Sequence, residues 1–405
     1  MARSLAPQSA FFTLLLGIFA GLPALSIDLS APTLVLLPGA LATNTVVAGL
    51  TLSLFMAGFA LGQLTGGPLS DRNGRRPVLL AGLLTYTVAG IACTLAWSGP
   101  ALLVARLIQG AGAGACSVLA FAMVQDLFQG EAARSKRSYV TVVFGVVPVL
   151  APALGAWLSD AAGWRSVHAV LAVAGLALLG VVVLWVAESR PAEARSSYGP
   201  APIGERLRDD RCFVTLSIVN ALSYAALFAY IAGAPVVMIR DMGYTPGAYA
   251  ALFACTALAL SFGAWLSGRL GRRGVGAASL AGSGLAAQAV ATITLAIYCT
   301  SIGGCDARAM AALLLLTCFG RGLAAPNLMH LAIGPRRNDA GFASAILGVT
   351  QLLGGALSSA AVAALLPRYG SVGVAATMAL MAASAASVWR IGTRRHKTAS
   401  PRTAE

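Results

Sequence analysis

Asp28 is an ionisable residue inside an apolar stretch, where ionisable side chains are rare and usually have a functional role. Of the 14 acidic residues, Asp28 alone lies well within an apolar segment, whereas Asp126 lies near the end of another. A charge in hydrocarbon costs about 2.5–3.5 kcal/mol on insertion scales, so it normally faces a cavity or a partner. Burial also raises the proton affinity of a carboxyl group in general. Asp28 is therefore our candidate for a group that takes up and releases a proton.

Arg106 and Gln109 lie in a second apolar segment and are the candidate partners of Asp28 in proton coupling. If the two segments run in opposite directions, Asp28 and Arg106 lie at similar depth, and an ion pair between them is geometrically allowed. One hypothesis is that protonation of Asp28 loosens a network of charges and hydrogen bonds that includes Arg106 and Gln109. Two alternatives are a contact between Asp28 and a cationic substrate and a permanent Asp28–Arg106 pair that locks two helices together.

Arg321 lies at the centre of a further apolar segment, and the cost of its burial needs an explanation. An anionic or zwitterionic substrate would supply one, and a cavity-facing role follows from it. The alternatives are a backbone carbonyl partner or a side chain that reaches the membrane surface. Aromatic residues at helical spacing often pack in a core, but we assign four residues of the seventh apolar segment to a substrate cavity, as we do Arg321. They are Asn220, Tyr224, Phe228 and Tyr230.

The composition places these residues in a membrane protein. Of 405 residues, 58% are hydrophobic and 10% are charged, with a mean hydropathy of +0.80. A soluble domain with so few polar side chains would not stay dispersed. The net charge of +14 does not predict a nucleic-acid partner, because the basic residues form short clusters between apolar blocks without an aromatic-studded basic face.

Twelve apolar blocks are long enough to cross a hydrocarbon core about 30 Å thick, which predicts an all-α integral membrane protein. The first block is interpreted as a retained helix, because it lacks the cleavage site of a signal peptide. Most of the 28 Lys and Arg residues fall at the termini and in the even-numbered loops, so both termini are expected in the cytoplasm. The expected spans are 11–32, 45–68, 78–97, 100–125, 139–158, 166–187, 212–239, 248–269, 275–299, 309–333, 341–366 and 371–391.

The chain consists of two related halves. The stretch 66–78, after the second span, shares Gly, Leu, Ser, Arg and Val positions at a constant offset with 263–275, after the eighth span. This agreement indicates a duplicated six-helix unit, which is typical of secondary transporters with a substrate site between the halves near the midplane. We expect a pseudo-twofold axis along the membrane normal that relates a bundle at 1–187 to a bundle at 212–391, with a cytoplasmic linker at 188–211 and a cytoplasmic tail at 392–405.

Two further motifs are candidates for conformational roles. In the loop 66–78, a glycine permits a tight turn and the arginines hold the loop at the membrane surface. The aspartate would cap the next helix or pair with an arginine, which gives the two halves a latch that must break as they rock. The near-copy at 263–275 disfavours an ordinary charged loop. In the fifth span, two prolines are expected to kink the helix and two glycines to allow close packing, with plain packing as the alternative. The candidate residues of the loop are Gly67, Asp71, Arg72, Gly74, Arg75 and Arg76. Those of the fifth span are Gly145, Pro148, Pro152 and Gly155.

Taken together, these motifs resemble the major facilitator superfamily. The stretch Gly67–Pro77 is similar to its loop signature, and the form Ser-Asp-Arg-x-Gly-Arg-Arg-Pro resembles drug:proton antiporters of the bicyclomycin and chloramphenicol resistance (Bcr/CflA) branch. The stretch Arg106–Gly112 resembles the helix 4 motif, and Gly145–Gly155 resembles the helix 5 antiporter motif. In the second half of the chain, Pro326-Asn327 is similar to the family's sequence pattern. The first span departs from the family's Asp-x-Tyr-x-Pro pattern, because Ser30 stands where the aromatic residue is usual.

The resemblance implies an MFS fold and drug/H+ antiport, in which a multidrug efflux protein exports apolar or amphipathic compounds such as antibiotics by alternating access. It also implies a location in the inner (plasma) membrane of a bacterial cell. The alternatives are a dedicated exporter of one metabolite and a proton-coupled importer; a membrane sensor is disfavoured, because a sensor needs no coupling residues.

No catalytic arrangement and no Walker phosphate loop are found. The three histidines are dispersed, and the cysteines lack metal-type spacing, although Cys299 and Cys305 flank one loop. We expect no enzyme activity, cofactor or metal, and we expect the proton gradient to be the energy source. The expected partners are a small-molecule substrate, protons and the lipid bilayer. The chain is expected to be a monomer.

Overall fold

Every regular element of the computed structural model is helical across the residues that it describes, 5–190, 210–302, 307–334 and 340–399. The all-α prediction is therefore confirmed for this part of the chain. The elements are α1 (Ala10–Ser30), η1 (Ala31–Val35), α2 (Leu37–Ala40), α3 (Thr45–Asn73), α4 (Arg75–Thr94), α5 (Gly99–Leu127), α6 (Gly130–Ala162), α7 (Trp164–Trp185), α9 (Arg211–Pro235), η3 (Val236–Asp241), α10 (Pro246–Arg272), α11 (Ala277–Ile302), α12 (Ala307–Ile333) and α13 (Ala340–Ala399).

The helices supply twelve apolar segments, the expected number. Ten helical stretches of the described residues are long and apolar enough to cross a membrane. The last of them joins two helices within α13, because Gly370 adopts φ 53° and ψ −135° and interrupts the helical path. The remaining segment is the shorter apolar part of α6, Val146–Ala162.

Polar caps explain where several helices begin. Ser9 accepts a hydrogen bond from the backbone N–H of Phe12 at the start of α1, and Asn44 accepts one from Val47 at the start of α3. Ser98 caps α5 in the same way. Such side chains satisfy backbone donors that have no partner within the helix, so the helix starts are encoded locally by the sequence.

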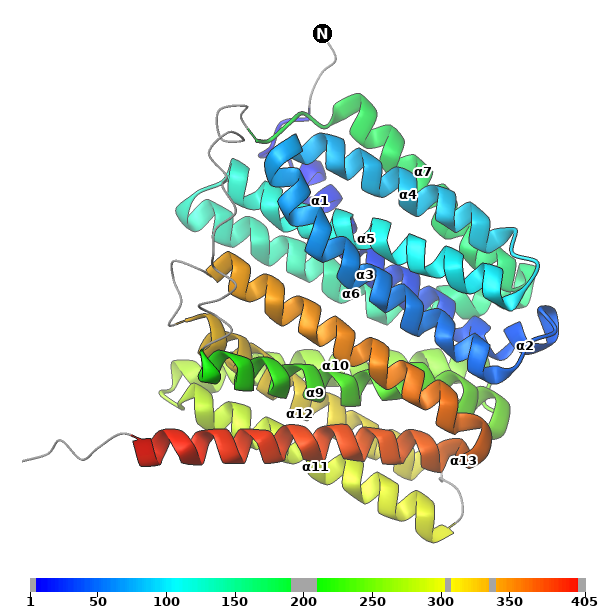
Figure 1. Ribbon diagram of the computed structural model, residues 1–405, viewed down its shortest axis with the longest axis vertical. Helices are drawn as coiled ribbons and strands as arrows, with labels where there is room; N and C mark the ends of the chain where they lie inside the picture. The colour runs from blue at the N-terminus through cyan, green and yellow to red at the C-terminus, as the bar shows by residue number, and fades with distance from the viewer. Residues whose placement is uncertain (1–4, 191–209, 303–306, 335–339, 400–405) are drawn as a thin grey trace, which may run out of the picture. The chain divides into compact units, whose positions relative to one another are not determined.

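The chain forms two compact units, one of residues 1–200 with 235–254 and the other of residues 201–234 with 255–405. Within the first unit, α5 packs against α1, α3 and α4, while α6 packs against α1 and α7 against α4 (Figure 1). Within the second unit, α11 packs against α12 and α13. The four segments expected from the sequence, 1–187, 188–211, 212–391 and 392–405, stay a prediction.

Glycines allow the closest helix contacts in both units. A Cβ atom added at Gly58 or Gly62 of α3 would collide with the backbone of α5, and one added at Gly110 would collide with the backbone of α3. In the second unit, Gly263 of α10 and Gly322 of α12 approach the backbone of each other's helix in the same way. Small residues at helix contacts are the usual means of association in a membrane, where burial of apolar surface gives no driving force.

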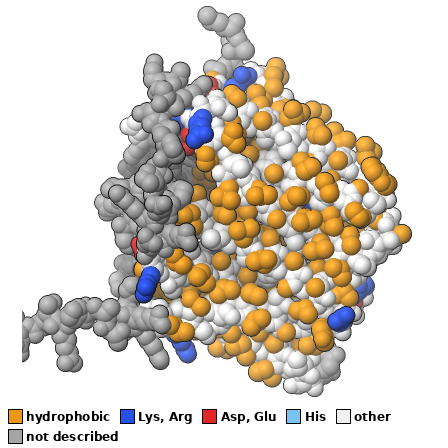
Figure 2. All heavy atoms as spheres, in the orientation of Figure 1, with side chains coloured by type: hydrophobic (Ala, Val, Ile, Leu, Met, Phe, Trp, Pro, Cys, Tyr) orange, Lys and Arg blue, Asp and Glu red, His pale blue; other side chains and the backbone are white. Residues whose placement is uncertain are grey.

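Large apolar side chains cover the outside of the molecule. Figure 2 shows a face spread with hydrophobic side chains, with Lys and Arg mostly toward its margins. Leu84, Val88, Val173 and Leu357 are each more than half exposed. Soluble proteins rarely expose apolar surface on this scale, so this surface faces lipid and the chain is a multi-pass membrane protein.

The stretch 66–78 is helical rather than a loop, which corrects the sequence-based expectation. Helix α3 continues through Asn73 and α4 begins at Arg75, so the turn between them is the single residue Gly74, with φ 98° and ψ 156°. The membrane-length rule located only the apolar part of α3, whereas the helix continues until a residue that tolerates positive φ ends it. The expected tight turn at Gly74 is present.

Candidate functional site

A buried polar network surrounds Arg106 in the first unit. Arg106 of α5 is only 1% exposed. Its Nη1 donates a hydrogen bond to Gln109 Oε1 at 2.9 Å, and its Nη2 donates to the backbone oxygen of Ser26 at 3.3 Å and to Ser30 Oγ at 3.2 Å. The guanidinium carbon also lies 4.3 Å from the centre of the Phe55 ring. One arginine therefore connects α5 to α1 and α3.

The network extends to α4 through two residues that sequence reasoning did not identify. The hydroxyl groups of Tyr86 and Ser26 are 2.7 Å apart, and Cys93 Sγ donates to Gln109 Oε1 at 3.7 Å. Hydroxyl and thiol side chains are frequent in apolar helices and follow no diagnostic spacing, so no sequence signal marked them. Arg106 and Gln109 were predicted together, and the structure brings them together.

Asp28 lies on α1 close to this network but makes no ion pair with Arg106. Asp28 is 5% exposed as a residue, and its carboxylate has no hydrogen-bond or ion-pair partner among the residues that the structure describes. Successive residues of an α-helix turn by about 100°, which places Asp28 on the face of α1 opposite Ser26 and Ser30, the two residues that accept hydrogen bonds from Arg106. The geometrically allowed ion pair is thus not formed, because similar depth does not ensure a shared helix face.

Helix α6 packs against α1 beside Asp28. A Cβ atom added at Gly155 would collide with the carbonyl group of Leu29, the residue after Asp28. Pro148 and Pro152 lie inside the same helix, as does Gly145. The structure therefore brings the last glycine of the predicted antiporter motif next to the predicted proton site, a neighbourhood that the sequence did not predict.

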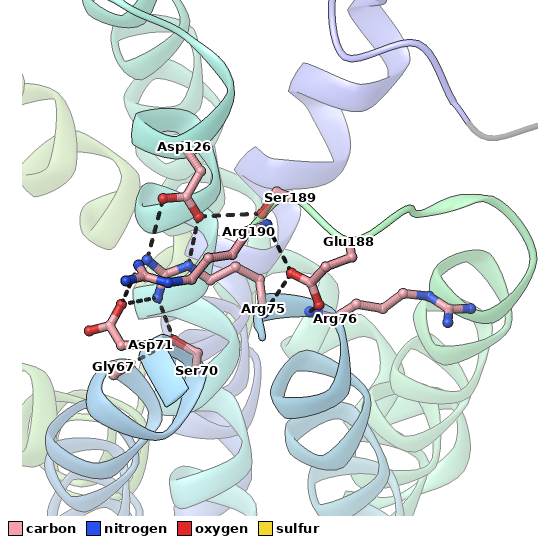
Figure 3. Close-up of polar contacts among 9 residues, drawn as sticks. All are labelled: Gly67, Ser70, Asp71, Arg75, Arg76, Asp126, Glu188, Ser189 and Arg190. Atoms are coloured by element: carbon pink, nitrogen blue, oxygen red, sulfur yellow. Dashed lines mark hydrogen bonds and ion pairs between the residues drawn. The ribbon is translucent and has the colours of Figure 1, made fainter. Parts of the chain in front are cut away.

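An ionic cluster forms where α3 and α5 end and α4 begins (Figure 3). The buried Arg75 donates from Nε to Asp126 Oδ2 at 2.7 Å and pairs through Nη1 with Asp71 Oδ1 at 2.9 Å. Its Nη1 also donates to Ser70 Oγ at 2.6 Å. Charge-assisted bonds of this kind are stronger than neutral ones. Asp71 was expected either to cap the next helix or to pair with an arginine, and in the structure it pairs with an arginine.

The segment Glu188–Arg190, which follows α7, completes the ionic cluster. Glu188 accepts hydrogen bonds from the backbone N–H groups of Arg75 and Arg76, at 2.8 and 3.2 Å. Arg190 Nη1 binds Asp71 Oδ1 at 2.8 Å. The carboxylate of Glu188 thus caps the N-terminal end of α4, where free donors and the helix dipole favour a negative charge. Sequence reasoning assigned these residues only to a linker, because the contact joins positions far apart in the chain.

The other residues of the motif have separate surroundings. Arg72 is exposed, and Arg76 Nη2 donates to the carbonyl of Val183 at 2.9 Å. The carbonyl of Gly67 accepts a hydrogen bond from Ser70 Oγ at 2.7 Å.

The predicted cavity residues of the second unit separate into two groups. Asn220 Oδ1 accepts a hydrogen bond from Arg321 Nη2 at 3.0 Å, and the Tyr224 ring lies beside the same guanidinium. Phe228 and Tyr230 are instead buried in the core, where Tyr230 Oη is 3.1 Å from Thr256 Oγ1.

Cysteines and other metal-ligating residues form no cluster in the described part of the chain. No group of three or more His, Cys, Asp or Glu side chains there is placed to hold a metal ion. Cys299 is disulfide-bonded, and Cys305, with which its pairing was considered, lies outside the described residues.

A multi-pass helical protein with charged side chains buried among its apolar helices has the features of a membrane transporter. Residues 13–359 match the model of the Major Facilitator Superfamily, and the chain belongs to this superfamily. It is therefore a transporter of small molecules rather than an enzyme.

Similar proteins and structures agree with this assignment. The chain is 30% identical over 340 residues to the multidrug resistance protein MdtL of Citrobacter koseri, a match that covers 83% of this chain and 81% of the relative. It is 29% identical over 344 residues to MdtL of Escherichia coli O45:K1, with the same coverage. A D-xylose-proton symporter matches with a TM-score of 0.73 and 18% identity, over 94% of this chain and 97% of that structure. A bacterial homologue of the lysosomal transporter Spinster matches with a TM-score of 0.74 and 16% identity, over 99% and 100%. These two structures share the fold.

Proposed function

We propose that this chain exports drugs across the bacterial inner membrane in exchange for protons, as a member of the Bcr/CflA branch with both termini in the cytoplasm. The observation that carries the proposal is the buried and unpaired carboxylate of Asp28, which lies on the helix that Arg106 binds. An ionisable group inside a membrane normally marks a proton or substrate pathway. The names of the relatives support drugs as the exported compounds, since those proteins are multidrug resistance proteins.

The surroundings of α1 suggest how protonation drives the transport cycle. Helix α1 is bound on one side to Arg106 of α5 and is packed on another side against Gly155 of α6. A change of charge at Asp28 alters the cost of keeping this segment in a water-poor position. We infer that the protonated and deprotonated carboxyl groups favour different positions of α1, and that alternating access follows from this difference.

The ionic cluster is the second part of the proposed mechanism. It joins the ends of α3, α4 and α5 to the segment after α7 through charge-assisted hydrogen bonds. Such a cluster holds one arrangement of these helix ends and is broken or reformed when the arrangement changes.

Drug susceptibility in a host that lacks its own efflux pumps tests this proposal. The wild-type chain is expected to raise the minimum inhibitory concentration of at least one antibiotic in a panel of apolar and amphipathic compounds. Asp28→Asn, present in the membrane in equal amount, is expected to give no protection, because asparagine cannot take up or release the proton. Unchanged susceptibility with the wild-type chain, or equal protection by Asp28→Asn, would contradict the proposal.

A further inference from the structure

Arg321 is a buried guanidinium with an incomplete set of partners. It lies on α12 and is 4% exposed. Its Nη2 donates to Asn220 Oδ1 of α9 at 3.0 Å and to Gln351 Oε1 of α13 at 3.2 Å. Its Nη1 is buried and has no hydrogen-bond partner among the described residues. A buried donor without an acceptor is costly, and here the donor belongs to a charged group.

The helices around Arg321 supply no negative charge. Helices α9, α10, α11, α12 and α13 contain no Asp or Glu within their bounds. The guanidinium is therefore held by two amide oxygens, with its central carbon 5.7 Å from the centre of the Tyr224 ring. Neutral acceptors compensate a buried charge only in part. A purely structural link between α9 and α13 would not need it, because Asn220 Nδ2 already donates to Gln351 Oε1 at 3.0 Å.

The surroundings of Arg321 are open where those of Arg106 are closed. Ser26, Phe55 and Gln109, which contact Arg106, are all fully buried. Tyr224 and Gln351, beside Arg321, are only half-buried. A ligand thus has access to the edge of the Arg321 cluster, whereas the Arg106 network is closed by its own neighbours.

We propose that Arg321, together with Asn220, Tyr224 and Gln351, binds the carboxylate group of transported compounds. A guanidinium presents parallel N–H donors that match the two oxygens of a carboxylate, and Nη1 is the free donor. The amides of Asn220 and Gln351 fix the orientation of the guanidinium. The substrates of this chain are accordingly anionic or zwitterionic compounds that carry a carboxylate, an assignment that rests on the proposed export function.

Matched pairs of carboxylic acids and their esters test the assignment. Norfloxacin and its ethyl ester form one pair, and further acid–ester pairs of amphipathic antibiotics complete the panel. Export from cells that express the wild-type chain, Arg321→Gln or Arg321→Lys gives the KM and kcat for each compound. Arg308→Gln, which removes a positive charge from an exposed position of the same helix, is the control for charge alone.

The assignment predicts a selective change in KM. Arg321→Gln is expected to raise the KM for the acids by about tenfold or more, which corresponds to the loss of one charge-assisted hydrogen-bond set, and to leave the KM for the esters unchanged. Arg321→Lys restores part of the preference because it keeps the charge. Arg308→Gln is expected to change neither KM.

Three results would overturn the assignment. The first is an equal effect of Arg321→Gln on the export of acids and of esters, which would show that the residue is only structural. A variant that fails to fold counts as this result, because it exports neither. Wild-type export of esters or cations but of no acid would exclude a carboxylate site while leaving the proposed export function in place. Export of no compound by the wild-type chain would contradict the proposed function and, with it, this assignment.

Discussion

Arg72 and Arg75 stand three positions apart in one charged motif, yet their surroundings differ. Arg75 is buried and bound to Asp71, Asp126 and Ser70, whereas Arg72 is exposed. A sequence pattern gives both residues equal weight, because it records side-chain type and not burial. Contributions to stability are decided by burial and partners, and exposed ion pairs contribute little.

Substitution of each arginine by glutamine tests this difference. Arg75→Gln is expected to lower the free energy of unfolding by about 3–5 kcal/mol, because it leaves Asp126 without its arginine and Asp71 with Arg190 alone. Arg72→Gln is expected to stay within about 0.5 kcal/mol of the wild type. Thermal unfolding of the purified chains in detergent, followed by tryptophan fluorescence, gives the comparison. Equal melting temperatures for the two variants would show that the ionic cluster does not stabilise the fold.

Individual residues were predicted from sequence where their type alone is diagnostic. A charge in an apolar segment identified Asp28, Arg106 and Arg321. Ser26, Tyr86 and Glu188 were missed, because their roles depend on partners far away in the chain. An Asp28–Arg106 ion pair was allowed by their similar depth and was one of the alternatives. It is absent among the described residues, since α1 turns Asp28 and the two acceptors of Arg106 to opposite faces.

At the scale of elements, helix contacts are set by glycine more than by large apolar residues. Helices α3 and α5 come close enough that Gly58, Gly62 and Gly110 leave no room for a Cβ atom. The sequence predicted most spans within a few residues, since span length follows from bilayer thickness. The ends of α3 and α4 were misplaced, because helices continue beyond the membrane until a residue such as Gly74 ends them.

Paired glycine substitutions test the close contact. Gly110→Ala is expected to lower the free energy of unfolding by about 1–3 kcal/mol, because the added methyl group forces α5 away from the backbone of Phe55. Gly67→Ala serves as the control in α3, since its Cβ would meet nothing within 4 Å; it is expected to be neutral or stabilising, because alanine favours the helix. The melting temperatures of the two variants decide the matter. A destabilised Gly67→Ala with an unaffected Gly110→Ala would refute this account of the packing.

At the scale of the whole molecule, the duplication seen in the sequence has a structural counterpart. Ser26 of α1 bonds to Tyr86 of α4, and Ser223 of α9 bonds to Gln288 of α11 at 2.6 Å. Each unit thus joins its first membrane-length helix to its third through a serine. The fold class and the number of apolar segments followed from composition and length, since the bilayer restricts a chain to few architectures. Substrate identity does not follow from these rules, because it depends on a few side chains such as Arg321.

Proton movement in everted membrane vesicles tests the central claim, drug export coupled to proton entry, most directly. A pH-sensitive dye reports the gradient that respiration builds inside the vesicles, and a drug from the susceptibility panel is then added. With the wild-type chain, the drug is expected to dissipate part of the gradient as protons leave in exchange, and with Asp28→Asn the gradient is expected to persist. A gradient that is unaffected by every exported drug, or that collapses equally in the Asp28→Asn variant, would contradict the account; drug accumulation in right-side-out vesicles would replace export by import.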